Sequence, residues 1–139
     1  MSAARPLALI TGGWHRIGAA IAARLAQAGY DLALHRHRDG PADTALTAEL
    51  ERHGAHWQGF TQELADDDAA DRLFDAASGH FGRAPVLIVN NASLFRDGDV
   101  MALSAEQLSR HLAVNLTTPT LLARRMGAHG GAIVNILDQ

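Results

Sequence analysis

The sequence contains no cysteine, which excludes disulfides, thiolate nucleophiles and cysteine-ligated zinc and is compatible with a reducing compartment. It also lacks a run of about 18 apolar residues and a basic start followed by an apolar stretch, as membrane spans and secretory signals require. The formal charge of −3, from 15 acidic and 12 basic residues, gives no broad positive surface for nucleic acid. We therefore expect a soluble, cytoplasmic protein that binds small molecules and neither nucleic acid nor membranes.

The length of 139 residues and the 47% hydrophobic content suit one compact domain, which should bury roughly two-thirds of its unfolded surface. No internal repeat, proline- or serine-rich linker or low-complexity tract divides the chain. A single domain over residues 1–139 is expected.

Short β-rich runs alternate with helical patterns along the chain, which is typical of βαβ units. The expected strands are residues 7–11, 30–35, 56–64, 86–90 and 132–137. Right-handed crossovers then give an α/β fold, a Rossmann-type doubly wound parallel sheet with strand order 3-2-1-4-5. Ligands bind such sheets beyond the carboxyl ends of the strands, here between the first and fourth strands.

The first helix pattern places Ile17, Ile21 and Leu25 on one face, which we expect to pack against the sheet, and Gly29 is placed to end the helix. A second helix is expected over residues 42–53 and ends at Gly54.

Two further helices carry capping signals. Asp66, Asp67 and Asp68 offer carboxylates to the start of a third helix. Ser104 and Gln107 suit a capping box for one long helix that continues toward Met126.

Residues 11–18 lie between an apolar strand and an amphipathic helix, where a phosphate-binding loop belongs. The glycines Gly12 and Gly18 let the backbone approach a pyrophosphate, whose charge meets the N–H groups at the helix start. Arg16 stands where the middle glycine of such a loop is common. An alternative interpretation is a purely structural strand-to-helix turn.

The basic run His35, Arg36, His37 and Arg38 follows the second strand, where an NAD enzyme of this fold carries an acidic residue for the ribose 2′-hydroxyl. Cationic groups there favour a 2′-phosphate, so NADPH is preferred over NADH. The alternatives are a solvated basic turn without a ligand, and a metal pair of His35 and His37, for which no third ligand is suggested nearby.

Three other positions carry polar or aromatic side chains at expected strand ends or inside a helix. Asn115 lies within the long helix, where an amide is costly unless its hydrogen bonds have a task. Asp138 follows the fifth strand, where a carboxyl partly removed from water could donate a proton. Phe95 could stack on a flat heterocycle. The alternatives are a hydrogen-bonded core asparagine, a surface aspartate and an ordinary apolar loop residue.

These motifs resemble the short-chain dehydrogenase/reductase family over essentially the whole chain. Residues 11–18 resemble its Thr-Gly-x-x-x-Gly-x-Gly signature, and residues 90–93, Asn-Asn-Ala-Ser, resemble its Asn-Asn-Ala-Gly motif. A pteridine reductase or dihydromonapterin reductase branch is similar at five places: Arg16-Ile17-Gly18, the His-x-His-Arg run, Ser93, Phe95 and Asp138.

The resemblance implies an NADP(H) cofactor and no metal. Asn115 would kink its helix and hold a water linked to the catalytic lysine, and Asp138 would assist proton delivery or bind the pterin edge. The substrate side would consist of Arg16, Phe95 and Asp138. The implied cofactor-binding residues are Gly12, His15, Arg16, Ile17, Gly18, His37, Arg38, Glu63, Leu64, Asn91, Ala92 and Ser93.

The family's general acid is a tyrosine in a Tyr-x-x-x-Lys motif on the helix after the fifth strand. The sequence reaches Gln139 without that motif, and Tyr30 belongs to another element. We therefore expect a domain truncated after strand five and catalytically incomplete as given, while the intact protein would form a homo-oligomeric (dimeric or tetrameric) NADP-dependent oxidoreductase acting on CH–NH or CH–OH groups.

The leading functional hypothesis is hydride transfer from NADPH to a C=N bond of a pterin or dihydropterin. The alternatives are a carbonyl reductase of the 3-oxoacyl type, for which serine rather than Asp138 is expected, and a non-catalytic NADPH-binding module.

Overall fold

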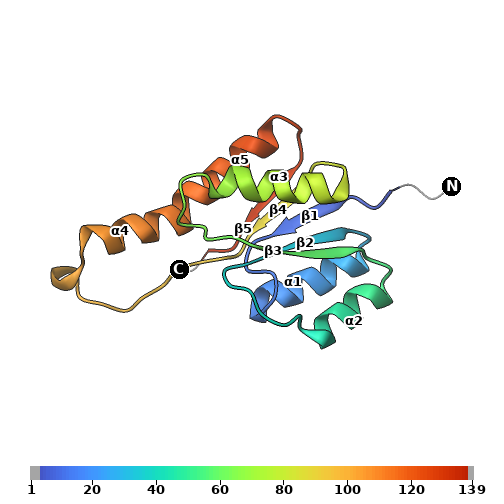
Figure 1. Ribbon diagram of the computed structural model, residues 1–139, viewed down its shortest axis with the longest axis horizontal. Helices are drawn as coiled ribbons and strands as arrows, with labels where there is room; N and C mark the ends of the chain where they lie inside the picture. The colour runs from blue at the N-terminus through green and yellow to red at the C-terminus, as the bar shows by residue number, and fades with distance from the viewer. Residues whose placement is uncertain (1–3, 138–139) are drawn as a thin grey trace.

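The computed structural model describes residues 4–137, and its centre is a parallel sheet of order β3-β2-β1-β4-β5 (Figure 1). This confirms the predicted α/β fold and strand order. The strands are β1 (Leu7–Ile10), β2 (Asp31–Arg36), β3 (Trp57–Thr61), β4 (Leu87–Asn90) and β5 (Ala132–Asn135). Strand β3 is shorter than predicted, and Asp138 lies outside the described residues.

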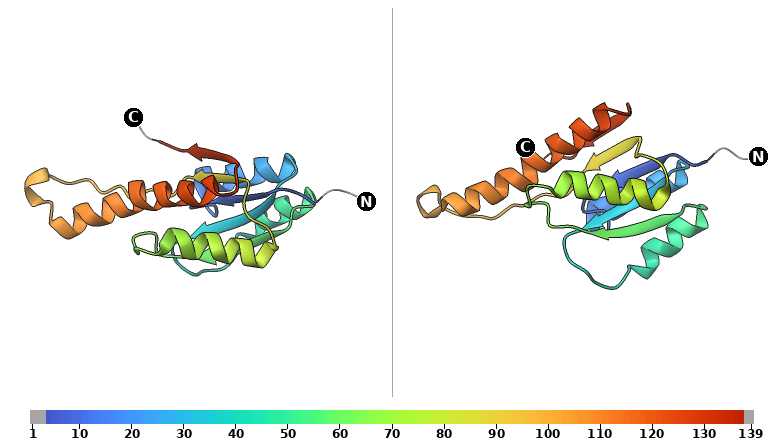
Figure 2. Two further views of the ribbon diagram at one scale, coloured as in Figure 1. Left: turned by 90° about the horizontal axis from the view of Figure 1, so that it is seen from above. Right: turned by 45° about the horizontal axis from the view of Figure 1, so that its top comes forward.

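The helices cover both faces of this sheet. They are α1 (Arg16–Gln27), α2 (Thr44–Arg52), α3 (Ala69–Phe81), α4 (Ala105–Leu112) and α5 (Thr118–Gly127). Helices α1 and α2 lie on one face and α3 and α5 on the other, while α4 extends beyond the sheet (Figures 1 and 2). Among residues 4–137, no helix is long and apolar enough to cross a membrane.

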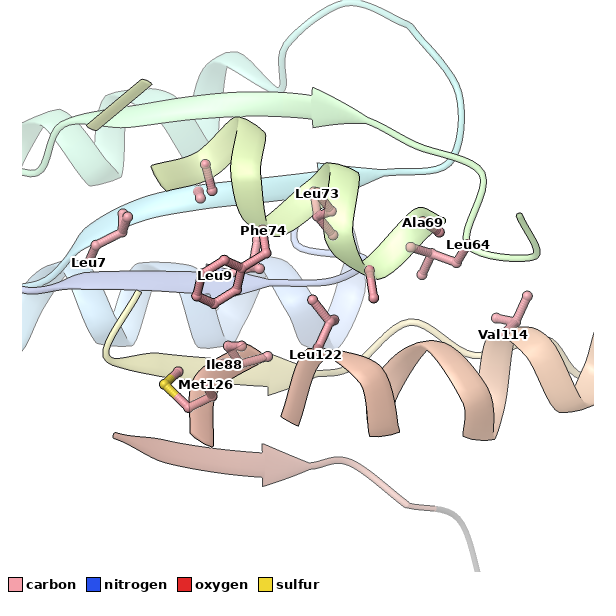
Figure 3. Packing of buried hydrophobic residues seen from close by; sticks show 13 residues of the cluster. Leu7, Leu9, Leu64, Ala69, Leu73, Phe74, Ile88, Val114, Leu122 and Met126 are labelled. Carbon is pink, nitrogen blue, oxygen red and sulfur yellow. The ribbon is translucent and has the colours of Figure 1, made fainter. Parts of the chain in front are cut away.

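Strand β1 is buried on both sides, which accounts for its uninterrupted apolar sequence. Leu7 and Leu9 belong to the core under α3 and α5, together with Phe74 (Figure 3). Ala8 and Ile10 belong to the core under α1 and α2. The strand that leads into the glycine-rich loop is therefore fixed from both faces.

Helix α1 packs through small side chains, and the prediction that Ile17 packs against the sheet was wrong. Its buried residues are Gly18, Ala22 and Ala26, whereas Ile17 is 59% exposed. A Cβ atom on Gly18 would lie 2.0 Å from the Gly12 carbonyl oxygen, so only glycine allows the helix start to come this close to the loop. The larger apolar residues therefore occupy the margin of the interface.

The helix ends agree only partly with the capping signals. The capping box of Ser104 and Gln107 is confirmed, and Gly29 follows α1 with a φ of +101°, as its role in ending the helix requires. Asp68 is the N-cap of α3 but makes no side-chain capping bond, so the prediction of carboxylate caps there was wrong. Instead Asp43, which was not singled out, caps α2 by accepting hydrogen bonds from two backbone N–H groups.

The predicted long helix is interrupted by a π-helical segment, Ala113–Thr117, that contains Asn115. Pro119 follows in the first turn of α5. Because proline has no N–H group, the carbonyl of the residue four positions earlier, Asn115, loses its usual helical partner. The α-helix is therefore replaced by a π-helical turn at Asn115, whose side chain forms hydrogen bonds outside the helix.

A buried ion network holds the amino-terminal edge of the sheet. The Asp31 side chain is 5% exposed, and its carboxylate lies 3.2 Å from Arg5 Nε and 2.5 Å from Arg83 Nη2. The same carboxylate accepts a hydrogen bond from the His56 backbone N–H. Asp31, the first residue of β2, thereby ties together the segments that lead into β1, β3 and β4. These segments lie at the amino-terminal ends of the strands, whereas the predicted site lies at the carboxyl ends.

Candidate functional site

The glycine-rich loop is held in place by the ends of two other strands. Gly12 has a φ of +62°, a conformation that glycine adopts without strain. Its N–H donates to His35 Nδ1 at 3.0 Å, and its carbonyl accepts from the Asn91 side-chain amide at 3.1 Å. The next N–H, of Gly13, donates to the His35 carbonyl at 3.1 Å.

The Thr11 hydroxyl joins this loop to the turn after β4. Thr11 is 2% exposed, and its Oγ1 accepts hydrogen bonds from the backbone N–H groups of Asn91 and Ala92, both at 3.0 Å. The ends of β1 and β4, which are neighbours in the sheet, therefore form a continuous hydrogen-bonded wall. This is the topological switch point at which doubly wound sheets bind ligands.

The start of α1 presents backbone N–H groups without a side-chain cap. The N-cap residue, His15, makes no capping hydrogen bond, and the first N–H groups of a helix have no partner within the helix. Arg16 is exposed and has a φ of +51°, which is strained for a residue with a Cβ atom. A positively charged side chain and a positive helix end thus meet at one place.

A cleft of about 750 Å³ lies over the carboxyl ends of β1, β2 and β4. It brings together nine of the residues predicted to bind a cofactor: Gly12, His15, Arg16, Ile17, His37, Arg38, Asn91, Ala92 and Ser93. Gly18 does not line the cleft, but it packs directly against the Gly12 carbonyl of the loop. Trp14, His35 and Arg36 line it as well.

Trp14 is a lining residue that the sequence reasoning did not single out. Its Nε1–H donates to the Leu34 carbonyl at 3.2 Å, and its ring lies edge-on to Trp57. The guanidinium carbon of Arg36 is 5.4 Å from the centre of the Trp14 ring. A bulky aromatic residue inside a glycine-rich turn was the available signal, because such a side chain needs a neighbouring strand to cover it.

The basic run after β2 divides into a buried and an exposed part. His35 is 2% exposed, and both of its ring nitrogens are hydrogen bonded within the protein, to Gly12 and Gln62. His35 therefore has no free ring nitrogen for the alternative of a metal pair with His37, and among residues 4–137 no group of three potential metal ligands is present. His37 and Arg38 are exposed.

A smaller cavity of about 190 Å³ adjoins the cleft and is lined by Glu63, Leu64 and Arg110. Glu63 accepts hydrogen bonds from the Ala65 N–H at 3.0 Å and from Arg110 at 2.8 Å, and lies 3.4 Å from His37 Nδ1. Burial alone would raise the pKa of Glu63, but these hydrogen bonds and positive neighbours outweigh it and lower the pKa below its ordinary value. The carboxylate is thus kept ionised.

A third pocket of about 480 Å³ contains Phe95 and Asn115. Phe95 is 78% exposed. Asn115 is exposed rather than a core residue, and its amide pairs with the backbone of Leu94, donating to the carbonyl and accepting from the N–H, both at 2.8 Å. This pairing is the task of the amide in the structure, and it fixes the segment that carries Phe95.

A doubly wound parallel sheet with a glycine turn and a basic cleft at its switch point is typical of nucleotide-binding proteins. The comparison with known families specifies the class further. A family model described as short chain dehydrogenase matches residues 6–137. The chain belongs to this family.

Individual relatives agree with this assignment. D-threitol dehydrogenase from Mycolicibacterium smegmatis is 37% identical over an alignment of 139 positions, which covers 96% of this chain and 52% of that protein. The 3-oxoacyl-[acyl-carrier-protein] reductase MabA from Mycobacterium tuberculosis is 36% identical over 117 residues, which are 84% of this chain and 42% of that protein. The chain spans about half the length of the curated relatives it matches.

Among solved structures, a short-chain dehydrogenase from Burkholderia cenocepacia in complex with NADP has a TM-score of 0.84 and 32% sequence identity. The similarity covers 94% of this chain and 54% of that protein. The common fold therefore includes the strand ends that form the cleft.

Proposed function

We propose that this chain binds NADP(H) in the large cleft as part of a short-chain oxidoreductase. The observation that carries the proposal is the pair His37 and Arg38, exposed at the end of β2 and lining the cleft. These basic side chains can attract the negative 2′-phosphate of the cofactor. An NAD enzyme would instead carry an acidic residue at the end of β2. The NADP-bound relative from Burkholderia supports the same cofactor.

The cleft fits such a dinucleotide in shape and charge. Gly12 lines the cleft, and Gly12 and Gly18 let the loop pack closely, since a Cβ on Gly12 would lie 3.1 Å from the Asn91 side chain and one on Gly18 would lie 2.0 Å from the Gly12 carbonyl oxygen. The pyrophosphate would lie against His15, Arg16 and Ile17 at the uncapped start of α1. Asn91, Ala92 and Ser93 would line the middle of the cofactor. Glu63 and Leu64 would take the adenine edge in the smaller cavity.

The cofactor, when bound, supplies a hydride. We propose that the acceptor is the C=N bond of a pterin or dihydropterin, stacked on Phe95 and held on one side by Arg16. Asn115 would support this side by fixing Leu94 and thus Phe95. Asp138, the proposed proton donor or pterin ligand, lies outside the described residues.

Reduction of a 3-oxoacyl group is a second candidate, because MabA is a relative at 36% identity. The decisive test uses the complete gene product with NADPH and either a dihydropterin or a 3-oxoacyl thioester, and follows NADPH oxidation. Turnover of the dihydropterin supports the first proposal, and turnover of the thioester alone refutes it. NADPH binding without turnover of either would support a non-catalytic module.

Cofactor binding is tested separately by titration with NADPH and NADH. We expect tighter binding of NADPH, and an Arg38→Ala variant should lose about tenfold or more in NADPH affinity, because charge-assisted hydrogen bonds contribute about 1.5–3 kcal/mol. Its NADH affinity should change little. An equal loss for both cofactors would contradict the assignment of Arg38 to the 2′-phosphate.

The protein is also proposed to be a homo-oligomer. Three apolar side chains on the outward part of α4 and the π-helical segment are exposed, namely Leu108, Leu112 and Leu116. Exposed apolar side chains that recur every four residues along a helix suit a protein contact. Sedimentation of the complete gene product would give the oligomeric state, and a monomer at micromolar concentration would refute the proposal.

A further inference from the structure

His35 contacts the glycine-rich loop at two points and β3 at a third. Its Nδ1 atom accepts from the Gly12 N–H at 3.0 Å, and its carbonyl accepts from the Gly13 N–H at 3.1 Å. Its Nε2 atom lies 2.8 Å from the Gln62 carbonyl oxygen, just beyond β3. The imidazole therefore bridges the loop and the neighbouring strand end across the floor of the cleft.

These partners fix the protonation state of the ring. A backbone N–H can only donate, so Nδ1, which faces Gly12, must carry no proton. A carbonyl oxygen can only accept, so Nε2, which faces Gln62, must carry one. His35 is consequently neutral and in a single tautomer, and a proton added at Nδ1 would face the Gly12 N–H.

We propose that His35 is a positioning residue of the phosphate loop, and that its protonation releases Gly12 and weakens the binding of NADPH. The inference rests on the proposed function for its ligand. In the neutral form the ring accepts from the Gly12 N–H, while the Asn91 amide donates to the Gly12 carbonyl, so the two peptide groups that flank the Gly12 Cα are both held. Losing one of these contacts frees a residue whose φ of +62° is not maintained by a side chain of its own.

The surroundings of His35 keep it neutral near physiological pH. Burial has the largest effect and lowers its pKa below the ordinary value of 6.5, and the positive charge of His37 acts in the same direction. The hydrogen bond to Gln62 and the carboxylate of Glu63 act in the opposite direction without cancelling the decrease. Further charged groups near this floor are Arg110 in the smaller cavity and His15, Arg16, Arg36 and Arg38 in the cleft.

A lowered pKa has a defined consequence for stability. The unfolded chain takes up a proton on this histidine as the pH falls through about 6.5, whereas the folded protein takes it up only at lower pH. His35 thus contributes stability that is fully present above 6.5 and lost as the pH falls toward its folded pKa. Stability is therefore lost first, as the pH falls from 6.5 toward the folded pKa, and the loop should lose its order only around that folded pKa and below it.

Two substitutions separate the two ring contacts. In His35→Asn, the amide oxygen stands near the position of Nδ1 and can still accept from Gly12, but the contact with Gln62 is lost. In His35→Gln, the longer side chain can still donate to Gln62, but no acceptor faces Gly12. Asparagine and glutamine are polar and uncharged, and their side chains do not take up a proton in the pH range of the experiment.

Affinity for NADPH is measured for the complete gene product and both variants between about pH 5 and about pH 8. At neutral pH we expect the asparagine variant to bind within about threefold of wild type and the glutamine variant about tenfold more weakly, the effect of one lost hydrogen bond. On acidification, wild type should lose more affinity than the asparagine variant. His37 and the 2′-phosphate are the same in both measurements, so the difference between the two proteins belongs to His35.

NMR of the imidazole nitrogens tests the bond without any nucleotide. The expected result is a neutral ring with the proton on Nε2 and a pKa below 6.5. A proton on Nδ1, a pKa of 6.5 or above, or glutamine and asparagine variants with equal NADPH affinity would overturn the inference. Wild type that shows the expected tautomer but binds no NADPH would instead refute the proposed function.

Discussion

Arg110 on α4 donates from Nη2 to Glu63 Oε2 at 2.8 Å, and the same oxygen lies 3.4 Å from His37 Nδ1. A carboxylate therefore stands beside one of the two residues proposed to bind the cofactor's 2′-phosphate. Arg110 offsets that negative charge from a helix that otherwise extends away from the sheet (Figure 1).

Replacing Arg110 by methionine should weaken NADPH binding by about three- to tenfold, because the unpaired charge of Glu63 would then repel the 2′-phosphate in a partly screened site. NADH, which lacks that phosphate, should be affected less. Titration of both cofactors measures the difference. Adding Glu63→Gln to the Arg110→Met variant removes the repelling charge and should restore the NADPH preference; a double variant as weak as the single one would contradict this account.

Replacing Arg16 by glycine should stabilise the fold and weaken cofactor binding. Its φ of +51° costs about 1–2 kcal/mol for a residue with a Cβ atom, and glycine removes this cost. The guanidinium that lines the cleft is lost at the same time. Chemical denaturation and NADPH titration measure the two effects.

The matched control for Arg16 is Arg24→Gly in the same helix, where the residue is exposed and within the regular helix. Glycine there should lower the free energy of unfolding by about 1 kcal/mol and leave NADPH affinity unchanged. If both variants lost stability equally, Arg16 would not be strained.

A methyl group on Gly18 should disrupt the phosphate loop. In Gly18→Ala the new Cβ would lie 2.0 Å from the Gly12 carbonyl oxygen, so the loop or the start of α1 must move. We expect a loss of stability of about 1–3 kcal/mol, typical of overpacking, and a loss of NADPH binding. Gly79→Ala in α3 is the control: no atom lies within 4 Å of its Cβ position, and alanine should stabilise that helix by about 0.5–1 kcal/mol. Equal effects of the two substitutions on thermal unfolding would contradict the steric argument.

Asp31 should be among the most sensitive charged residues of the sheet. Asp31→Asn leaves the partly exposed Arg5 and Arg83 without their shared carboxylate, and we expect a loss of about 1.5–3 kcal/mol, the range for hydrogen bonds to charged groups. Asp68→Asn removes an exposed carboxylate that lies 3.5 Å from Arg72, and should cost less than about 1 kcal/mol. Urea denaturation compares the two variants, and a small effect of Asp31→Asn would show that the network adds little to stability.

The strand order followed from the alternation of apolar runs and helices, because parallel strands and right-handed crossovers allow few arrangements. The packing face of α1 followed only in part, because Ile21 and Leu25 pack against the core whereas Ile17 does not. Periodicity selected Ile17 with its bulky neighbours, whereas the close approach of Gly12 and α1 requires Gly18 at the contact. A hydrophobic scale ranks residues by apolarity and contains no term for the distance at which two backbones meet.

The candidate site shows the same division. The residues of the cleft are near one another because strand ends meet at one edge, which sequence patterns indicate well. His35 looked like one member of a basic run, but its place in β2, between β1 and β3, buries it and brings its ring to Gly12. Its role depends on a contact 23 positions away along the chain, which no local pattern contains.

The end of β1 and the turn after β4 are joined at one hydroxyl group, because Thr11 Oγ1 accepts hydrogen bonds from two backbone N–H groups of that turn. The width of the slot at this point is therefore set by the sheet before any ligand arrives. Little of the protein backbone then has to become ordered when a dinucleotide binds. The conformational entropy lost by the protein should therefore reduce the affinity less than in a site that closes around its ligand. Adaptation to a different nucleotide would have to proceed through the side chains on the rim, with the spacing of the walls unchanged.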